Sequence, residues 1–287
     1  MKSLLEYLKQ SQEEKKAIGH FNISDLVALK AIFNSARNLN LPIIIGVSEG
    51  EREFVGVSQA AALVSSLRHE YNYPIFLNAD HTHSIEKVKE AAIAGFDEII
   101  IDFSNLPLDE NIAKTKEAIT LARSINPQVV IEGEIGFIGK SSEVMEKAPE
   151  GLELTKPEDA KRYVEETKVD VLAPAVGNMH GLLKSMVSGD VKKRLNIELI
   201  GKLKEATNGV YMTLHGGSGT ADSDFLAAIK AGMNIVHVNT EIRIAWRKGV
   251  EQALKDKPDE VAPYKLLPIA IDEIGKIVTQ RLELFNS

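Results

Sequence analysis

The chain has 287 residues, of which 44% are hydrophobic and 26% charged, and its net charge is −7. That length and balance provide material for a large globular core, and the absence of a basic stripe argues against a protein that binds nucleic acid through its phosphates. The chain contains no cysteine. This excludes disulfides, thiolate catalysis and cysteine metal sites, so a metal here would need His, Asp or Glu ligands.

The N-terminal segment is amphipathic, and no apolar run along the chain reaches the length that a membrane span needs. We therefore expect a protein of the cytoplasm that binds neither membranes nor nucleic acids. Small anions could still be bound by local backbone amides.

Short apolar runs alternate with helix-forming stretches along the chain. The first helix is expected at 3–16, where Leu4, Leu5 and Leu8 recur at helical spacing. Strands are expected at 17–22, 41–48, 74–79, 98–104, 129–136, 169–177, 210–219 and 234–240. Helices are expected between them, at 25–39, 57–69, 84–95, up to 123, 155–167 and 197–207, and two more end the chain.

Helix ends carry recognisable signals. Ser84 is expected to cap the helix at 84–95, which stops at Gly95. Thr155 and Glu158 have the spacing of a capping box, which predicts a helix that starts there. The stretch before it, up to Glu153, is rich in Gly, Ser, Lys and Glu and is expected to be irregular.

Each expected strand is short and apolar on both faces, and helices separate the strands, which is the pattern of a parallel sheet covered by helices. Eight such units in this length favour an α/β fold, a closed (β/α)8 TIM barrel. The helix at 3–16 could close the bottom of that barrel. No linker rich in Pro, Gly or Ser divides the chain, so we expect residues 1–287 to form a single TIM-barrel domain.

Polar side chains follow the expected strands at their carboxyl ends, where this kind of fold binds its ligands. Three of the seven histidines, His81, His180 and His215, come just after the third, sixth and seventh strands. Three neutral imidazoles are a sufficient protein set for a catalytic zinc. His20 is expected to face the helix layer instead. The full set at the strand ends is Asn22, Ser48, Asp80, His81, Asp102, Glu132, Glu134, His180, His215, Asn239 and Thr240.

A glycine-rich segment follows the seventh strand, at His215-Gly216-Gly217-Ser218-Gly219. Glycines let the backbone approach a phosphate closely, and Ser218 can donate its hydroxyl. This is also the region where TIM barrels commonly bind phosphate. A metal and a phosphate in one barrel mouth indicate a phosphorylated substrate with a polarised oxygen.

Five motifs together resemble those of the class II, metal-dependent ketose-bisphosphate aldolases, which act on fructose or tagatose 1,6-bisphosphate. They are Asp80-His81, Glu132-Gly133-Glu134-Ile135-Gly136, Gly177-Asn178-Met179-His180-Gly181, the segment from His215 to Gly219, and Val238-Asn239-Thr240-Glu241. The match runs in the right order from about Gly19 to Thr240, and the spaced set is far more specific than any single motif.

The resemblance implies that His81, His180 and His215 bind a catalytic Zn²⁺ and that Asp80 is the proton donor and acceptor. Asp102 and Glu134 match positions where the family can hold a second or displaced metal, and a monovalent cation is a further candidate cofactor. The implied partners are a small phosphorylated sugar and other copies of the chain, in a homodimer or homotetramer. The implied substrate-binding residues are Asn22, Ser48, Gly181, Lys184, Gly216, Gly217, Ser218, His237, Asn239 and Thr240.

The chain also departs from the family's usual pattern. Asn78 stands where a His is usual, Thr82 where a small residue or Cys is frequent, and Leu183 where Tyr is frequent. The loop that contains Lys140 replaces a glycine-rich acidic loop. His237 stands where the family commonly has an Asn that contacts substrate, so it either accepts a different sugar phosphate or points into the helix layer. These departures bear on which ketose phosphate is the substrate.

The leading hypothesis is therefore a zinc-dependent aldolase that cleaves a ketose 1,6-bisphosphate, with fructose bisphosphate first and tagatose bisphosphate next. The alternatives are a metal-dependent hydrolase or isomerase on the same barrel, and a sugar-phosphate-binding protein without turnover. A Schiff-base aldolase would need a lysine at a strand end, and the nearest candidates, Lys140 and Lys184, lie in loops. Arg281 in the last helix is either a phosphate contact across subunits or a solvated helix arginine.

Overall fold

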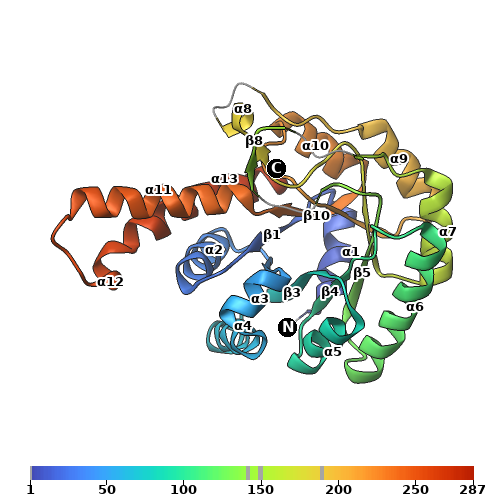
Figure 1. The fold of residues 1–287 in the computed structure, drawn as a ribbon, viewed down its shortest axis with the longest axis horizontal. Helices are drawn as coiled ribbons and strands as arrows, with labels where there is room; N and C mark the ends of the chain where they lie inside the picture. The colour runs from blue at the N-terminus through green and yellow to red at the C-terminus, as the bar shows by residue number, and fades with distance from the viewer. Residues whose placement is uncertain (1, 140–142, 148–150, 188–190) are drawn as a thin grey trace.

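The computed structural model describes residues 2–139, 143–147, 151–187 and 191–287. Within these residues, parallel strands form a closed barrel in the order β1-β10-β9-β7-β5-β4-β3-β2, so each strand pairs with its neighbours in the chain and the last pairs with the first. The predicted (β/α)8 barrel is confirmed (Figure 1). The barrel strands are β1 (Ile18–Asn22), β2 (Ile43–Val47), β3 (Ile75–Thr82), β4 (Glu98–Ile101), β5 (Val130–Ile135), β7 (Val171–Pro174), β9 (Tyr211–Leu214) and β10 (Met233–Val238).

Helices surround the barrel and pack on its strands. The buried apolar residues between the strands and these helices form one large cluster, which is the main core of the protein. Among the described residues, no helix is both long enough and apolar enough to span a membrane. The covering helices are α2 (Leu26–Leu39), α4 (Val57–Tyr71), α5 (Ile85–Ala94), α6 (Leu108–Ile125), α7 (Pro157–Thr167), α9 (Ile197–Ala206), α10 (Asp222–Ala231), α11 (Thr240–Asp256) and α13 (Pro268–Phe285).

The last helices extend beyond the barrel. Helices α11 and α13 pack side by side, and α12 (Pro263–Leu266) lies between them in the chain at the far end of this pair. In Figure 1 they project to the left as an arm. Three helices therefore end the chain, where the sequence predicted two.

Local capping interactions explain where several helices begin and end. Asp25 accepts the N–H of Ala28 and starts α2, and Ser84 accepts the N–H of Lys87 and starts α5. Gly95 ends α5 in the left-handed conformation, with φ of +81°. The ends predicted for α5 at Ser84 and Gly95 are thus confirmed.

Helix α1 (Leu4–Glu14) closes the amino-terminal end of the barrel. Ser3 and Glu6 form a capping box that fixes its first turn. Its buried side chains, Leu4 and Leu8, pack against apolar residues that begin the barrel strands. The partners are Ile18, Ile44, Phe76, Val130, Val171 and Ile235. The expected position of this helix is confirmed, and it leaves the carboxyl ends of the strands as the open end.

The capping box expected at Thr155 is wrong. Helix α7 begins at Pro157, and its N-cap Lys156 makes no side-chain cap. The Thr155 hydroxyl instead donates to the carbonyl of Ile135 at 2.9 Å and accepts the N–H of Ala175 at 2.8 Å. It joins the carboxyl ends of β5 and β7 because those strand ends have polar backbone groups to satisfy.

Two further elements differ from expectation. The residues after β2 form a short helix, α3 (Glu49–Val55), which the sequence did not predict. The stretch expected to be irregular after β5 contains a short strand, β6 (Val144–Met145), which pairs with β8 (Leu182–Leu183) just before α8 (Lys184–Val187). This pairing brings together the loops that follow β5 and β7. Lys140 lies outside the described residues.

Candidate metal centre and anion recess

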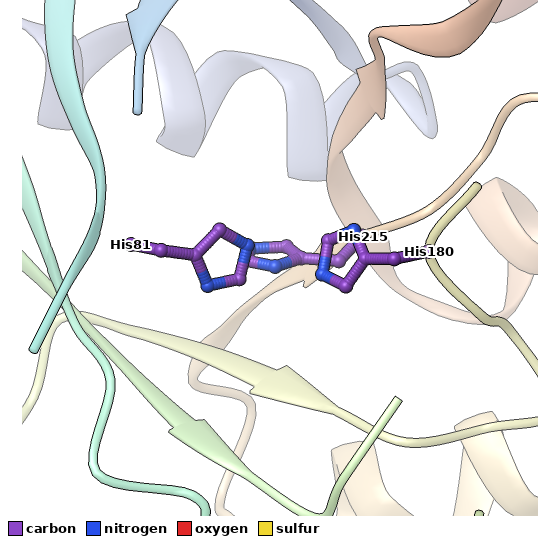
Figure 2. Close-up of side chains that lie close together, drawn as sticks. All are labelled: His81, His180 and His215. Atoms are coloured by element: carbon purple, nitrogen blue, oxygen red, sulfur yellow. The ribbon is translucent and has the colours of Figure 1, made fainter. Parts of the chain in front are cut away.

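Three histidines meet at the carboxyl end of the barrel. His81 lies at the end of β3, His180 in the loop after β7, and His215 directly after β9. Figure 2 shows the three rings converging on one region. The ring centroids of His81 lie 4.8 Å from those of both His180 and His215, and the last two are 5.9 Å apart. The structure thus brings together the three residues that the sequence singled out.

The free nitrogens of this group suit a metal. His81 directs Nδ1 to Asp102 Oδ2 at 2.8 Å, and His215 directs Nε2 to Glu132 Oε1 at 2.6 Å. Their other nitrogens, His81 Nε2 and His215 Nδ1, are buried and have no hydrogen-bond partner within the described part of the chain. A carboxylate that holds the far nitrogen of an imidazole is the usual arrangement around zinc. Donor atoms of the three histidines lie within 4.8 Å of one another, so the donor set fits a zinc ion with an open position.

Two carboxylates form a second group around His81. Its Nδ1 lies 2.8 Å from Asp102 and 3.1 Å from Glu134 Oε2. The same oxygen of Glu134 lies 3.5 Å from His215 Nδ1 and has no hydrogen-bond partner among the described residues. His81, Asp102 and Glu134 therefore form a second possible metal group beside the first. Glu132 was expected only as a strand-end carboxylate, and its bond to His215 emerges from the structure.

The backbone at the end of β3 is unusual. The pairing with β4 shifts register between Ala79 and Thr82, and His81 has φ of +44°, which few non-glycine residues adopt. Arg52 of α3 is buried beneath this bend and donates to the carbonyl oxygens of Val47, Asp80 and His81 at 2.6, 3.3 and 3.4 Å. These bonds stabilise the bend that directs His81 to the metal group. The sequence carried no signal for this role of Arg52.

Asp80 lies beside the histidines and lines both the large cavity and the recess described below. Its Oδ2 accepts a hydrogen bond from Asn22 at 2.7 Å, and its Oδ1 has no hydrogen-bond partner in the described residues. Oδ1 lies 3.7 Å from both His81 Nε2 and His237 Nδ1. Burial raises the pKa of Asp80, but the positive charge of the neighbouring His81 imidazolium and the hydrogen bond from Asn22 bring it below its ordinary value. Asp80 is therefore ionised, with one oxygen available.

His20 and His237 both point into the barrel, not toward the helices. Their rings stack with centroids 3.4 Å apart, and His237 also stacks on His215 at 4.3 Å. The expectation that His20 faces the helix layer is therefore wrong. The alternative in which His237 points into the helix layer is wrong too, because β1 and β10 direct both side chains into the barrel. Burial lowers the pKa of His20 to about 4 and lowers that of His237 well below its ordinary value, so both rings are neutral.

Two of the residues that depart from the family's usual pattern, Asn78 and Thr82, are buried in β3. Asn78 is fully buried and donates to Glu98 Oε2 at 2.6 Å. Thr82 is likewise buried, and its hydroxyl receives a hydrogen bond from Arg52 at 3.3 Å. Neither side chain lines the cavities described next.

A cavity of about 460 Å³ opens beside the metal group, and a smaller recess continues from it. The large cavity is lined by Ser48, Asp80, His81, Asp102 and His180, among others. The recess is lined by Asn22, Asp80, His180, Gly181, Gly216, Ser218, His237, Asn239 and Thr240. Nearly all of the expected substrate residues therefore border one space that adjoins the metal group.

Two expected substrate residues lie elsewhere. Gly217 donates its N–H to the carbonyl of His237 at 3.0 Å and does not line the recess. Lys184 starts α8, has an exposed side chain and forms an ion pair with Glu146. Lys184 lines neither cavity.

The glycine loop after β9 depends on close backbone approach. Gly216 has φ of +58°, and a Cβ atom there would lie 2.3 Å from the carbonyl oxygen of Met179, so only glycine fits. At the end of this loop, Gly219 donates its N–H to Glu241 at 2.8 Å. Arg281 of α13 holds that carboxylate at 2.8 Å and is itself buried. The expectation of a solvated helix arginine is therefore wrong, since Arg281 braces the loop within its own chain. A phosphate contact across subunits stays a prediction.

Comparison with known proteins gives consistent results. Residues 2–287 match the family model described as "Fructose-bisphosphate aldolase class-II". A Bacillus subtilis protein named "Probable fructose-bisphosphate aldolase" is 34% identical, and a Staphylococcus aureus fructose-bisphosphate aldolase is 33% identical. Both alignments cover 99% of this chain and 97% of the relative. The crystal structure of the YdjI aldolase from Escherichia coli K12 superposes with a TM-score of 0.83 at 24% identity, over 99% of this chain and 97% of that one.

Proposed function

The chain belongs to the class II fructose-bisphosphate aldolase family, and from this premise we propose that it reversibly cleaves a ketose 1,6-bisphosphate. The products are dihydroxyacetone phosphate and an aldehyde phosphate, and fructose 1,6-bisphosphate is the first candidate substrate. The observation that carries the proposal is the convergence of three histidines beside an ionised Asp80 and a glycine-lined recess.

The metal would be held by His81 Nε2, His215 Nδ1 and the ring of His180. When bound, a zinc ion there supplies Lewis acidity that stabilises negative charge on the oxygens next to the bond that breaks. Asp102 and Glu132 fix the rings of His81 and His215 for this task. We further propose that Asp102 and Glu134 can hold a second or displaced metal.

Asp80 would take the proton of the C4 hydroxyl during cleavage and return it during condensation. Its free Oδ1 borders the cavity, and its depressed pKa keeps it ionised. Asn22 holds the other oxygen, which orients the carboxylate toward the substrate. Such a group needs hydrogen-bond reach to the hydroxyl, and general acid–base catalysis of this kind contributes about 10²–10⁴-fold in rate.

The recess would hold the phosphate of the dihydroxyacetone phosphate half. Gly181 and Gly216 permit close approach of the backbone, and Ser218 and Asn239 provide polar groups. Thr240 begins α11, a long helix whose amino-terminal end favours an anion. Gripping this phosphate orients the substrate at a distance from the reacting bond.

Substrate identity would be decided around Asp80. Fructose and tagatose bisphosphates differ in configuration at C4, which is the carbon whose hydroxyl Asp80 would contact. His237 lies 3.7 Å from Asp80 and lines the recess, so this neutral ring is placed to favour one configuration. The distal phosphate would meet the large cavity, which Arg243 lines while paired with Glu51 at 2.8 Å.

A coupled assay for dihydroxyacetone phosphate tests the proposal. The protein, loaded with Zn²⁺, is given ketose mono- and bisphosphates that include fructose and tagatose 1,6-bisphosphate. Cleavage should be lost with EDTA and should resist borohydride in the presence of substrate. Release of inorganic phosphate without dihydroxyacetone phosphate would indicate a hydrolase instead.

Asp80→Ala supplies the matching variant. It should keep its zinc content and its phosphate affinity, because Asp80 is not among the proposed metal ligands, and should lose cleavage. Unchanged turnover would remove Asp80 from its proposed role.

We also propose that the protein is cytoplasmic and forms a homodimer or homotetramer, as the family does. Light scattering coupled to gel filtration measures the assembly directly. A monomer at the concentrations of the activity assay would contradict this part of the proposal.

A further inference from the structure

A buried lysine lies directly behind the glycine-lined recess. Only 4% of Lys193 is exposed, and its Nζ donates to the carbonyl oxygens of Met179, Gly181 and Gly216 at 2.7, 2.7 and 2.9 Å. Met179 and Gly181 flank the histidine of the β7 loop, and Gly216 follows the histidine of β9. One ammonium thus joins the two loops that carry two of the three clustered histidines and the glycines of the recess.

The three acceptors match the charged form of the side chain. An ammonium has three N–H donors, whereas a neutral amine has two and would turn a lone pair toward one carbonyl. Burial lowers the pKa of Lys193 to about 7, and the nearby carboxylate of Glu241 acts in the opposite direction. The three carbonyl oxygens offset the desolvation of the ammonium, as such oxygens do around a bound monovalent ion.

The backbone of Lys193 is held by the same loop. Its N–H donates to the carbonyl of Gly219 at 2.9 Å, its carbonyl accepts the N–H of Ala221 at 3.3 Å, and it forms a parallel bridge with Thr220. Lys193 lies between α8 and α9, and these bonds fix the start of its side chain against the loop after β9. A rigid stem makes the ammonium a defined part of the recess wall.

We propose that the Lys193 ammonium serves as a built-in cation that holds the β7 and β9 loops in the geometry needed to bind a phosphate. This inference rests on the proposed function and names Lys193 as a positioning residue of that site, since its ammonium acts through the backbone of the two loops. The ammonium fills the place among the three carbonyl oxygens that a separate monovalent cation would take. The wild-type protein therefore needs no monovalent cation to bind phosphate.

The test is phosphate binding, measured by calorimetry on the zinc-loaded protein with inorganic phosphate and with dihydroxyacetone phosphate. Wild-type affinity should be the same in NaCl, KCl, NH₄Cl and tetramethylammonium chloride at constant ionic strength. Lys193→Ala should bind phosphate at least about tenfold more weakly. NH₄⁺ or K⁺ should restore much of the loss, because the space among the carbonyls is then open, and tetramethylammonium should not, because it is too large.

Two variants make the test specific. Lys193→Met keeps the length of the side chain without its charge, so it should be weakened and should not respond to small cations. Lys192→Ala removes an exposed neighbouring lysine and should bind phosphate like the wild type. If Lys193→Ala folds poorly, its unfolding midpoint is measured in NH₄Cl and in tetramethylammonium chloride. The midpoint should be higher in NH₄Cl, because only the small cation fits among the carbonyl oxygens.

Unweakened phosphate binding by Lys193→Ala would overturn the inference. So would a loss that no small cation repairs, or a wild-type protein that itself requires K⁺. If the ion effects appear but no ketose bisphosphate is cleaved, the proposed function fails while the role of Lys193 stands. If cleavage occurs and Lys193→Ala binds phosphate normally, the proposed function stands and the role of Lys193 fails.

Discussion

In two of the three clustered histidines, a carboxylate holds one ring nitrogen, so the other ring nitrogen is left available for a metal. Glu132 does this for His215 and Asp102 for His81. Glu98 is a second fully buried carboxyl in the barrel, but it is bonded to Asn78 and not to a histidine. Burial and the neighbouring Glu132 raise the pKa of Glu98 well above its ordinary value, so it is protonated. The two buried glutamates therefore have different roles.

Glu132→Gln should weaken zinc binding by about 10–100-fold, because an amide oxygen accepts the His215 Nε2–H less strongly than a carboxylate oxygen does, while the shape is kept. Competition with a chromophoric chelator measures this affinity. The control is Glu98→Gln, which exchanges a neutral acid for an amide of the same shape and should leave zinc affinity unchanged. Equal affinities for the two variants would exclude a specific role for Glu132.

His20 is buried as a neutral ring, which links stability to pH. The folded chain resists protonation of His20 down to about pH 4, whereas the unfolded chain takes up this proton near pH 6.5. Stability from this group is therefore fully present above pH 6.5 and is lost as the pH falls toward 4. The loss attributable to His20 is about 3 kcal/mol.

His20→Phe removes the titrating group and should reduce the fall in unfolding free energy between pH 7 and pH 4.5. Urea unfolding in EDTA measures it without a contribution from metal release. His69→Phe provides a control, since His69 is an exposed histidine at the end of α4. A pH dependence in His20→Phe that is as steep as in the wild type would contradict the assignment.

At the scale of elements, α1 determines how the barrel is closed. Leu8 is fully buried among residues at the amino-terminal ends of the strands, while Leu5 on the outer side of the same helix is 38% exposed. The proposed metal ligands and Asp80 lie at the opposite end of the strands. Stability and catalysis should therefore separate at this helix, as they do between the two ends of TIM barrels.

Leu8→Ala should lower the free energy of unfolding by about 2–5 kcal/mol, because it leaves a cavity in the closed end of the barrel. Leu5→Ala should change it by less than about 0.5 kcal/mol. Urea unfolding compares the two, and kcat of the folded Leu8→Ala protein should stay near the wild-type value. A large effect of Leu5→Ala would mean that this face of α1 is covered.

At the scale of the whole molecule, the metal group joins distant parts of the chain. His81, His180 and His215 come from β3, the β7 loop and β9, so they meet only when the barrel is folded. A ligand that binds the folded state alone stabilises it by mass action. Zinc binding and global stability should therefore be coupled.

Zinc at 100 times its dissociation constant should stabilise the protein by about 2.7 kcal/mol, and EDTA should remove this gain. Scanning calorimetry with and without zinc measures the shift in Tm. His180→Ala is the matched control, and its Tm should respond weakly to zinc. An equal shift in both proteins would place the stabilising zinc elsewhere.

Much of the fold followed from local signals in the sequence. The alternation of short apolar runs and amphipathic stretches predicted the order of strands and helices, and Ser84 and Gly95 marked the ends of α5. The three histidines were also found, because the carboxyl ends of parallel strands must meet at one edge. Such features depend on neighbours in the chain and on a topology that recurs in many proteins.

Other features required the tertiary structure. Thr155 had the pattern of a cap but bonds two strand ends, and Arg281 looked like a solvated helix residue but is buried on Glu241. His20 and Lys193 gave no signal of their roles, since the partners of each lie in other strands and loops. The sequence by itself determined the order of the barrel strands and their covering helices, and which edge bears the chemistry. Only the tertiary structure decided the partners of buried polar groups, because desolvation makes each of them bond to whatever the fold places beside it.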